Sequence, residues 1–491
     1  MSIKYRRPEL VALKPLYKQI RDVLKGPKAV KDAGIEYLPM PNTEKDDKAN
    51  KARYLTYKQR AQFYNACART LDGLVGQIFY RDPVMELPAI LEPLIESVDG
   101  GELSLYQQSK ESSGVTLSLG HGCLLTDYPE TARAATRKEM MDGRVRATIT
   151  LYYPEQIINW RWSTLGAKKF LSLLVLEETY DKEDDGYEAE KGTQWREFRI
   201  EAEEGMSPRL HCMVWREGDQ GFIKVQDFYP RKGNGQPWDI IPVSFMGAVN
   251  NDPIPDRPPF EDMSHINIGH YRNSADYEES CFMVGQPTPW AAGLTESWVK
   301  EVWEGELRLG SSAVVPLPEG GSFGLAQAAP NTMPKEAMEI KERQMVALGA
   351  KLVEQSQVQR TATEAGQENV VESSVLSTVA QNVSSAYRKA IGFALEYMNS
   401  SDKFEFELNT DFEIARMSAQ ERQQLLTEWQ GGGITWEEYR WNLKRSGVAY
   451  EDDKKAKTQI ENDASLNLGG TGLTPGEQDG EESEESEEDE D

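Results

Sequence analysis

One periodic segment, residues 365–398, constrains the fold of this 491-residue chain more than any other. Its apolar side chains recur every three or four positions over about six turns, which places them on one face of a helix. From Leu376 on, no glycine interrupts the pattern before Gly392. The segment therefore predicts a long helix buried along one side. The apolar positions are Leu376, Val379, Ala380, Val383, Ala386, Tyr387, Ala390, Ile391, Ala394, Leu395 and Met398.

Two more long helices are predicted upstream, with a compact insert between them. Residues 260–285 read as one helix that ends at the prolines of 286–289, and Pro334 occupies the favoured first position of a second helix over 335–355. Between them, residues 290–334 contain glycines, prolines and short apolar runs, which favour a small β-containing module. The sequence thus predicts a helical hairpin with a small domain at its tip, followed by a polar stretch over 356–363.

The N-terminal half combines helical and β patterns. Helices are predicted over 10–25 and 51–79, with a proline-containing surface loop over 26–48 between them. Residues 103–128 predict a helix that leads into a short strand at Cys123. From 147 to 245 the chain has short runs of β-branched and aromatic residues separated by polar hinges, which predicts an antiparallel meander.

The C-terminal region predicts a strand over 404–409 and helices over 418–430 and 435–446, with a Ser418–Glu421 capping box. The whole chain has a net charge of −26. Its last 15 residues, 477–491, contain 11 acidic side chains and no basic one. We expect everything beyond Glu451 to be disordered. Two interpretations of this tail stay open: a solubilising end, or a segment that repels DNA or engages a basic partner.

The composition is typical of a chain that folds around a hydrophobic core. Hydrophobic residues make up 39% of the sequence, and no run is long enough for a membrane helix. The N-terminus lacks the apolar stretch of a signal peptide, so we expect synthesis in the cytosol. Four scattered cysteines predict reduced thiols in the core. His265 and His270 lie five residues apart, on different faces of a helix, and are interpreted as structural.

Catalytic patterns are missing from the sequence. It has no phosphate-binding glycine loop, nucleophile elbow, dinucleotide fingerprint or zinc-protease motif. Residues 319–324 are glycine-rich but lack a following lysine, and they predict a turn. His121 with Cys123 is a conceivable nucleophile–base couple without a third partner. We therefore expect no catalytic residue, metal or cofactor, and a role in assembly or binding rather than in enzymatic catalysis.

The order of these elements resembles the portal proteins of tailed bacteriophages, on the shorter-portal branch of that family. The resemblance covers residues 1–450 and rests on several short segments: 98–105, 120–129, 153–160, 239–245, 266–277 and 359–365. The resemblance implies an α+β portal fold. Its parts would be an N-terminal wing of helices plus a β-rich region (1–258), two stem helices (259–286 and 334–355), a small α/β clip (287–333), a tunnel loop (356–364), a long kinked wing helix with a strand (365–412), a helical crown (413–450) and a disordered acidic tail (451–491).

The resemblance also implies a function. The chain would form a ring, usually of twelve subunits, at one capsid vertex, and double-stranded DNA would pass through it non-specifically during packaging and ejection. Implied partners are the terminase large subunit, head-completion or adaptor proteins, the major capsid protein and the scaffold. The expected location is the virion, after assembly in the bacterial cytoplasm and without a membrane. An acidic chain suits such a channel, because attraction to phosphates would hinder sliding.

Two sets of site residues follow from the resemblance. The tunnel loop would face DNA with Gln357, Gln359, Arg360, Thr361 and Thr363, although Arg360 is equally suited to an ion pair between subunits. The clip would bind terminase and adaptor through Trp290, Trp298, Trp303 and Arg308, where the tryptophans are ring anchors or core residues. Two alternatives remain: another phage head or connector protein, which the helix–insert–helix order disfavours, and an acidic hydrolase.

Overall fold

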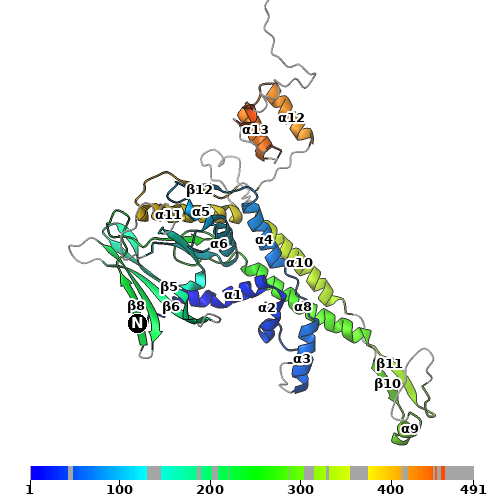
Figure 1. Ribbon diagram of the computed structural model, residues 1–491. Coiled ribbons are helices and arrows are strands. Elements are labelled where there is room, and N and C mark those ends of the chain that lie inside the picture. The colour runs from blue at the N-terminus through cyan, green and yellow to red at the C-terminus, as the bar shows by residue number, and fades with distance from the viewer. Residues whose placement is uncertain are drawn as a thin grey trace, which may run out of the picture. The chain divides into compact units, whose positions relative to one another are not determined.

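The structure is a computed structural model and describes residues 2–42, 48–129, 145–184, 189–201, 208–218, 221–286, 288–303, 315–327, 331–353, 374–410, 412, 419–445, 448–449 and 455–458. The chain divides into two units, Met1–Phe412 and Glu413–Asp491, and each is described by itself. Figure 1 labels many of the helices and strands of the two units. The predicted tunnel loop and most of the acidic tail lie outside the described residues.

The first unit begins with α1 (Pro8–Lys25), α2 (Pro27–Asp32), the 3₁₀ turn η1 (Gly34–Glu36), α3 (Lys48–Arg60) and α4 (Ala66–Ile78). The prediction of a surface loop over 26–48 is therefore wrong where α2 and η1 form, and residues 43–47 of that range lie outside the described residues. Gly26, at φ +92°, turns the chain so that Pro27 starts α2, and the segment then buries Val30, Tyr37 and Leu38. Burial of these apolar side chains outweighs the loop character of the prolines.

The prediction of one helix over 51–79 is also wrong, because the chain is non-helical over 61–65. The Asn65 side chain caps α4 by accepting a hydrogen bond from the Ala68 amide at 3.1 Å. The break is also held from outside by α8 (Glu261–Gly285), whose Ser274 hydroxyl accepts from the Gln62 amide at 3.1 Å. Tertiary hydrogen bonds thus replace the intrahelical ones that the periodic pattern predicted.

A three-stranded antiparallel sheet forms the centre of this unit, in the order β3 (Thr148–Tyr152), β2 (His121–Asp127), β9 (Val243–Gly247). The helix α6 (Leu105–Leu119), capped by the reciprocal Ser104–Gln107 box, leads directly into β2. The predicted helix-to-strand transition is confirmed. Gly120 makes the turn at φ +75°, where a β-carbon would lie 3.0 Å from the Asp256 carbonyl oxygen. The short β1 (Val84–Glu86) and α5 (Pro93–Glu96) precede α6.

A second sheet has five strands, β4 (Ile157–Leu165), β5 (Lys168–Asp184), β6 (Ala189–Glu201), β7 (Arg209–Gly218) and β8 (Gly221–Phe228), which follow the 3₁₀ turn η2 (Pro154–Gln156). Each strand pairs antiparallel with the next in sequence, so the predicted meander is confirmed. The N-terminal segment is attached to this sheet: the Arg7 amide donates to the Ile158 carbonyl at 2.9 Å, and the Arg6 guanidinium contacts both Glu177 oxygens at 2.6 Å.

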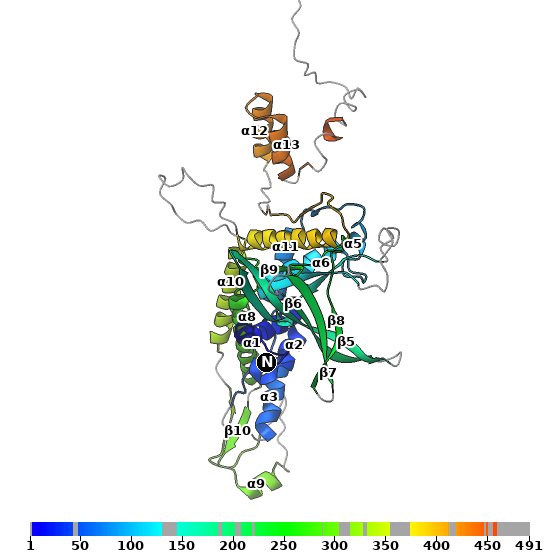
Figure 2. The same cartoon turned by 90° about the vertical axis from the view of Figure 1, so that its left-hand side faces the viewer.

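The helices α8 and α10 (Met333–Lys351) lie side by side in both Figure 1 and Figure 2. Between them in sequence come β10 (Thr288–Ala292), α9 (Glu296–Glu301) and β11 (Ser322–Ala326), and β10 pairs antiparallel with β11. The predicted order of helix, small β-containing insert and helix is therefore present.

The predicted long helix is α11 (Val375–Tyr397), which packs on β2, β9 and α6 (Figure 2). Ser374 caps it by accepting from the Ser377 amide, and residues 365–373 of the predicted segment lie outside the described residues. Figure 2 shows α11 as a straight helix, so the expected kink is not found between Val375 and Tyr397. After α11, β12 (Glu405–Glu407) pairs with β1.

Polar groups under α11 are paired with one another. The Tyr387 hydroxyl lies 2.9 Å from the Ser112 hydroxyl and 3.1 Å from the Gln108 carbonyl oxygen, and the Gln108 amide donates to the Ile149 carbonyl at 2.8 Å. The Thr126 hydroxyl donates to the Ala390 carbonyl oxygen at 3.0 Å. A buried polar group without a partner costs free energy, so this network lets α11 pack on a sheet that contains polar side chains.

The second unit contains α12 (Ala419–Gln430) and α13 (Trp436–Arg445). The Trp429 ring lies 4.9 Å from the Tyr439 ring and 5.3 Å from the Trp436 ring, measured between centroids. Thr435 and Glu438 form a capping box at the start of α13, whereas Ser418 lies outside the described residues.

The cysteines follow the prediction in part. Cys67, Cys123 and Cys212 are buried free thiols, but Cys281 is exposed, so its predicted place in the core is wrong. The buried residues of α8 end at Ala275, and Cys281 comes later on that helix.

We predict that Gly233→Ala destabilises the first unit. The loop around Gly233 packs on the end of α11, where the Gly233 amide donates to the Glu396 carbonyl at 2.9 Å. A β-carbon there would lie 2.4 Å from the Tyr397 carbonyl oxygen and 2.6 Å from the Asn399 nitrogen, so backbone must move. The expected loss is about 1–3 kcal/mol in the free energy of urea unfolding.

The matched control is Gly76→Ala in α4, where an added β-carbon meets no atom within 4 Å. We expect this variant to be unchanged or up to about 1 kcal/mol more stable, because alanine favours helix. Equal unfolding midpoints for the Gly233 variant and the parent would contradict the packing described for this loop.

Candidate functional site

The paired helices α8 and α10 flank the insert that carries Trp290, Trp298 and Trp303, so their attachment to the body matters first. Asn267 of α8 is buried, and its amide donates to the Tyr64 carbonyl oxygen at 2.7 Å while its carbonyl oxygen accepts from the Cys67 amide at 3.3 Å. The side chain thus binds the end of the break between α3 and α4 and the first turn of α4. No sequence pattern indicated this role, because an asparagine inside a helix has no distinctive spacing.

Further along α8, α3 is attached by charged and aromatic groups. The Tyr57 hydroxyl donates to Asp276 at 2.6 Å, and burial, followed by this hydrogen bond, raises the pKa of Tyr57 above its usual range. Arg60 forms an ion pair with Glu279 and lies 3.7 Å from the centroid of the Phe282 ring. Three kinds of interaction therefore hold α3 against the helix that leads to the insert.

The two histidines of α8 contact protein groups. His270 is 5% exposed, and its Nε2 lies 3.0 Å from Glu342 of α10, with the Tyr64 ring 5.8 Å away. A cavity of about 310 Å³ adjoins it, lined by Gln62, Phe63, Tyr64, Ser274, Tyr277, Glu278, Met338 and Glu342. His265 lies 3.2 Å from the Gln19 amide. Among the described residues, no three His, Cys, Asp or Glu side chains are grouped to hold a metal ion.

One face of α10 is exposed in the single chain. Val346 is 74% and Ile340 48% exposed, and both belong to a stripe of exposed residues that recur at helical spacing. The other members are Glu336, Arg343, Ala347 and Ala350. In contrast, among the described residues of α10, Met345 alone is buried.

The predicted tunnel-loop residues Gln357, Gln359, Arg360, Thr361 and Thr363 lie outside the described residues, but the segments that flank them are fixed. The Leu376 amide at the start of α11 donates to the carbonyl oxygen of Leu352 at 3.1 Å, directly after α10. Leu352 and Val353 pack against the hydrophobic core. The two described ends that the connection over 354–373 joins therefore lie next to each other.

The insert presents its tryptophans in different ways, and Arg308 lies outside the described residues. Trp290 of β10 is opposite Gly324 of β11, and its indole lies across that glycine, where a β-carbon would come within 2.8 Å. Trp290 is 46% exposed. The Trp303 indole donates to the Pro316 carbonyl oxygen at 3.0 Å, so Trp303 supports the insert itself. Trp298 of α9 is half-buried.

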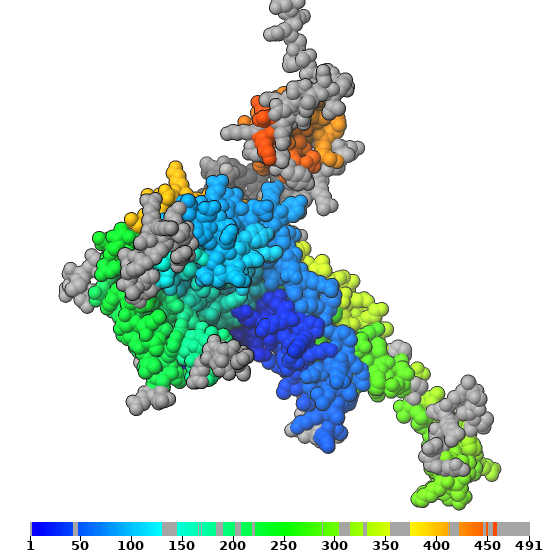
Figure 3. Space-filling view, in the orientation of Figure 1, coloured from blue at the N-terminus to red at the C-terminus, as the bar shows by residue number. Residues whose placement is uncertain are grey.

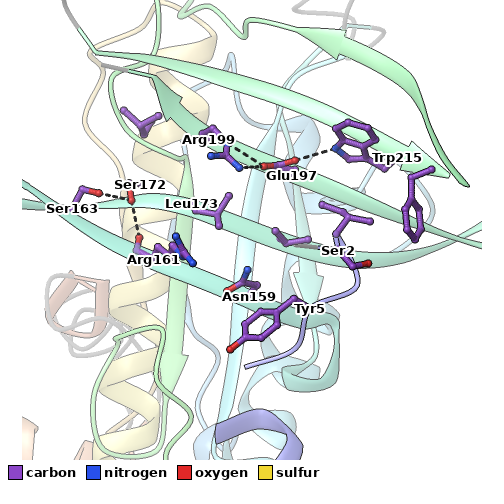
Figure 4. A pocket seen from close by; sticks show the side chains of 14 residues that line it. Ser2, Tyr5, Asn159, Arg161, Ser163, Ser172, Leu173, Glu197, Arg199 and Trp215 are labelled. Atoms are coloured by element: carbon purple, nitrogen blue, oxygen red, sulfur yellow. Dashed lines mark hydrogen bonds and ion pairs between the residues drawn. The ribbon is translucent and has the colours of Figure 1, made fainter. Parts of the chain in front are cut away.

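The five-stranded sheet has a cavity of about 620 Å³ on one face (Figure 4). Glu197 is 6% exposed. Its carboxylate accepts hydrogen bonds from the Arg199 guanidinium and, at 3.0 Å, from the Trp215 indole. Ser2, Tyr5, Asn159, Arg161, Ser163, Ser172 and Leu173 also line it. Sequence reasoning missed this cavity, although Asn159, Arg161 and Ser163 alternate along β4 as residues on one strand face do. No cysteine or histidine is among its lining residues.

His121 and Cys123 do not form a reactive pair. Both side chains are buried in β2, and the His121 ring is stacked on Phe245 at 5.9 Å between centroids. Burial lowers the pKa of His121 to about 3 and raises the pKa of the Cys123 thiol well above its usual range. A nucleophilic cysteine requires a stabilised thiolate, and these surroundings favour the neutral thiol.

Comparisons with known proteins give one family match and distant structural likeness. Residues 259–398 match a family described as a domain of unknown function, DUF4055, and this range spans α8, the insert, α10 and α11. Among solved structures, a chain from the neck of an empty GTA particle computed with C6 symmetry is similar over 79% of this chain and 90% of that chain, at 11% identity and a TM-score of 0.40. No curated protein matches the sequence. Within the described residues, no helix is long and apolar enough to cross a membrane.

We predict that Asn267→Ala destabilises the junction between α8 and the α3–α4 break. The change would leave the Tyr64 carbonyl and the Cys67 amide without their partner, and the expected loss is about 2–3 kcal/mol in the free energy of unfolding. Native-state hydrogen exchange should show faster exchange at the Cys67 amide. Asn273→Ala, at a half-buried position of the same helix, is the control and should change stability by less than about 0.5 kcal/mol. Similar losses in both variants would contradict the assigned role.

Proposed function

We propose that this chain is the portal protein of a tailed bacteriophage, a subunit of an oligomeric ring at one capsid vertex through which DNA is packaged and ejected. One observation carries the proposal: the order and packing of α8, the β10–α9–β11 insert, α10 and α11. Two helices attached to the body by buried polar groups lead to a small insert, and a third long helix is buried on a sheet immediately after them. This is the arrangement that the resemblance to portal proteins led us to expect.

Ring formation gives the exposed face of α10 a role. Paired helices satisfy their backbone groups internally, so they tolerate a water-filled passage on one side and a neighbouring subunit on another. A ring that closes requires two different complementary patches on each subunit. The stripe containing Ile340, Arg343 and Val346 supplies apolar and charged groups for one of them. We propose that this ring contains twelve subunits.

The remaining roles follow from that proposal. The insert, with half-exposed Trp290, would bind the terminase large subunit during packaging and a head-completion protein afterwards. The major capsid protein and scaffold would surround the ring in the virion, after assembly in the host cytoplasm. The proposed function requires no catalytic group, metal or cofactor. The DNA contact would come from residues 356–364, presented between the adjacent ends of α10 and α11.

Two other functions make different predictions. Another phage head or connector protein would also assemble, but it would not need an insert between two long helices. An acidic hydrolase would turn over a substrate as a monomer. Negative-stain microscopy and native mass spectrometry of the purified chain separate these cases. Closed rings with an axial hole are expected, and a stable monomer that hydrolyses a substrate would overturn the proposal.

The double variant Ile340→Asp, Val346→Asp should lose ring formation while the single chain stays folded. Both side chains are exposed in the single chain, so their replacement should change its thermal midpoint little, whereas a charge at a desolvated interface without a partner is costly. We expect at least a tenfold fall in the ring fraction by native mass spectrometry. Gln344→Asp adds a negative charge at another exposed position of α10 and serves as control. Rings in undiminished yield would show that this face is not an interface.

Deletion of residues 357–363 should leave ring assembly intact and impair DNA packaging or retention. The connection over 354–373 joins two fixed points that are hydrogen-bonded neighbours, so shortening it should cost little stability. Ring yield would be measured by microscopy, and packaged DNA by nuclease protection in a complementation assay. Failure of the rings themselves would place the DNA-contacting loop elsewhere in the chain.

A further inference from the structure

The cavity beside His270 is lined by hydrogen-bond acceptors and aromatic rings. Its volume is about 310 Å³, at the lower end of the roughly 300–1,000 Å³ that ligand-binding cavities have. None of the described residues that line it is a lysine or an arginine. The cavity therefore suits a positively charged group that donates hydrogen bonds. Two carboxylates and three further aromatic side chains line it: Glu278, Glu342, Phe63, Tyr64 and Tyr277.

The acceptors of this cavity are only partly satisfied within the single chain. Glu342 lies 3.0 Å from Nε2 of His270. Because an ionised carboxylate only accepts, Nε2 carries the proton, and Nδ1 of the neutral ring is an acceptor. That Nδ1 is buried and has no hydrogen-bond partner among the described residues. Glu278 is half-buried and has no ion-pair partner in the same part of the chain. A cation that entered the cavity would compensate this negative charge.

The exposed stripe of α10 contains a cation that is also uncompensated. Arg343 is exposed, and the described residues supply neither a carboxylate nor an aromatic ring as its partner. Figure 3 shows part of α10, in yellow-green, at the molecular surface. Arg343 is the basic member of the stripe, whose other members are Glu336, Ile340, Val346, Ala347 and Ala350. The single chain thus leaves a guanidinium and an acidic cavity unpaired on the same helical hairpin.

The stripe and the cavity lie on different sides of α10. Met338 and Glu342 line the cavity from this helix. At about 100° per residue, Arg343 lies about 140° around the helix from Met338 and about 100° from Glu342. The two patches are therefore distinct, and their charges are complementary. A ring that closes by rotation requires this kind of heterologous contact, in which one side of each subunit meets a different side of the next.

We propose that Arg343 of one copy enters the cavity beside His270 of a neighbouring copy, where its guanidinium pairs with Glu278 and Glu342. This inference rests on the proposed function and names the second patch that ring closure requires. Tyr64 is 44% exposed in the single chain and would be covered in the same contact. A similar interaction already exists at this ring, since the Arg69 guanidinium lies 5.4 Å from the Tyr64 centroid.

A free amine or another small cation is the competing occupant of the cavity. It would compensate the carboxylates but leave Arg343 unpaired and the apolar side chains of Ile340 and Val346 in water. A second copy satisfies both patches in one contact, because the stripe supplies the guanidinium together with the apolar groups beside it. The charge balance and the exposure of the stripe therefore favour a second copy.

Two charge reversals in the full chain, Arg343→Glu and Glu278→Arg, test the proposal. Each variant alone brings like charges together at every contact, so its ring fraction in native mass spectrometry should fall at least about tenfold. An equal mixture of the two should regain at least about half of the parental ring fraction. In an alternating ring, the two introduced side chains meet at every second contact and the two native ones at the others. With one variant labelled with ¹⁵N, the rings should contain both variants in equal numbers.

Lys110→Glu and Glu96→Arg are the matched controls, at exposed positions of α6 and α5 that do not line the cavity. Each should keep the parental ring fraction. Recovery in the mixture also shows that both test variants fold, because a misfolded chain could not enter a ring. Rings of the parent without recovery in the mixture overturn this inference alone. Parental ring fractions in both test variants also overturn it, since the cavity would then take another occupant. A parent that forms no rings overturns the proposed function and this inference together.

Discussion

The burial of α11 against the three-stranded sheet is the interaction on which the rest of the first unit depends. Its apolar face is covered by β2, β9 and α6, and each fully buried large aliphatic or aromatic side chain contributes about 1.5–3 kcal/mol. Polar groups beneath it bond to the helix: the Ser112 hydroxyl pairs with the hydroxyl of Tyr387 of α11, and the Thr126 hydroxyl donates to the Ala390 carbonyl oxygen. The helix therefore has one permitted register on the sheet, since a shift along its axis would break these bonds as well as the packing.

The position of α11 in turn fixes the base of the α8–α10 pair from two sides. Between β9 and α8, the Asn251 amide donates to the Asn382 carbonyl at 2.8 Å, and the Asn382 amide donates to the Gly247 carbonyl at 2.8 Å. After α10, the Leu352 carbonyl accepts from the Leu376 amide at 3.1 Å. The entry to α8 and the exit from α10 are thus both attached to α11. Elements far apart in sequence are thus held together at the base of the α8–α10 pair.

The sequence predicted the elements whose signal is local and missed those decided by tertiary contacts. The periodicity of α11 and the alternation of the meander are intrinsic to their segments, so both were predicted. The break at 61–65 depends on Asn267 and Ser274, about 200 residues away, and no local pattern encodes it. The helix α2 was missed because its prolines indicate a loop, while burial of Val30 and Leu38 is apparent only in three dimensions. The same holds for the cavity beside Glu197, which the N-terminal residues Ser2, Ile3 and Tyr5 line together with strands of the five-stranded sheet.

The α8–α10 pair is unevenly stabilised along its length in the single chain. The last buried residue of α8 is Ala275, and among the described residues of α10 Met345 alone is buried. The half of the pair nearer the insert therefore buries few apolar side chains. Helices of this length are marginal in water unless an apolar face is covered. If copies associate through the exposed face of α10, the same contact that closes a ring also supplies this missing burial. Folding of the distal helices and assembly would then be linked, and binding energy between subunits would appear as stability of the hairpin. Such coupling favours complete rings over partial ones, because a subunit at an open end has one side of its hairpin uncovered.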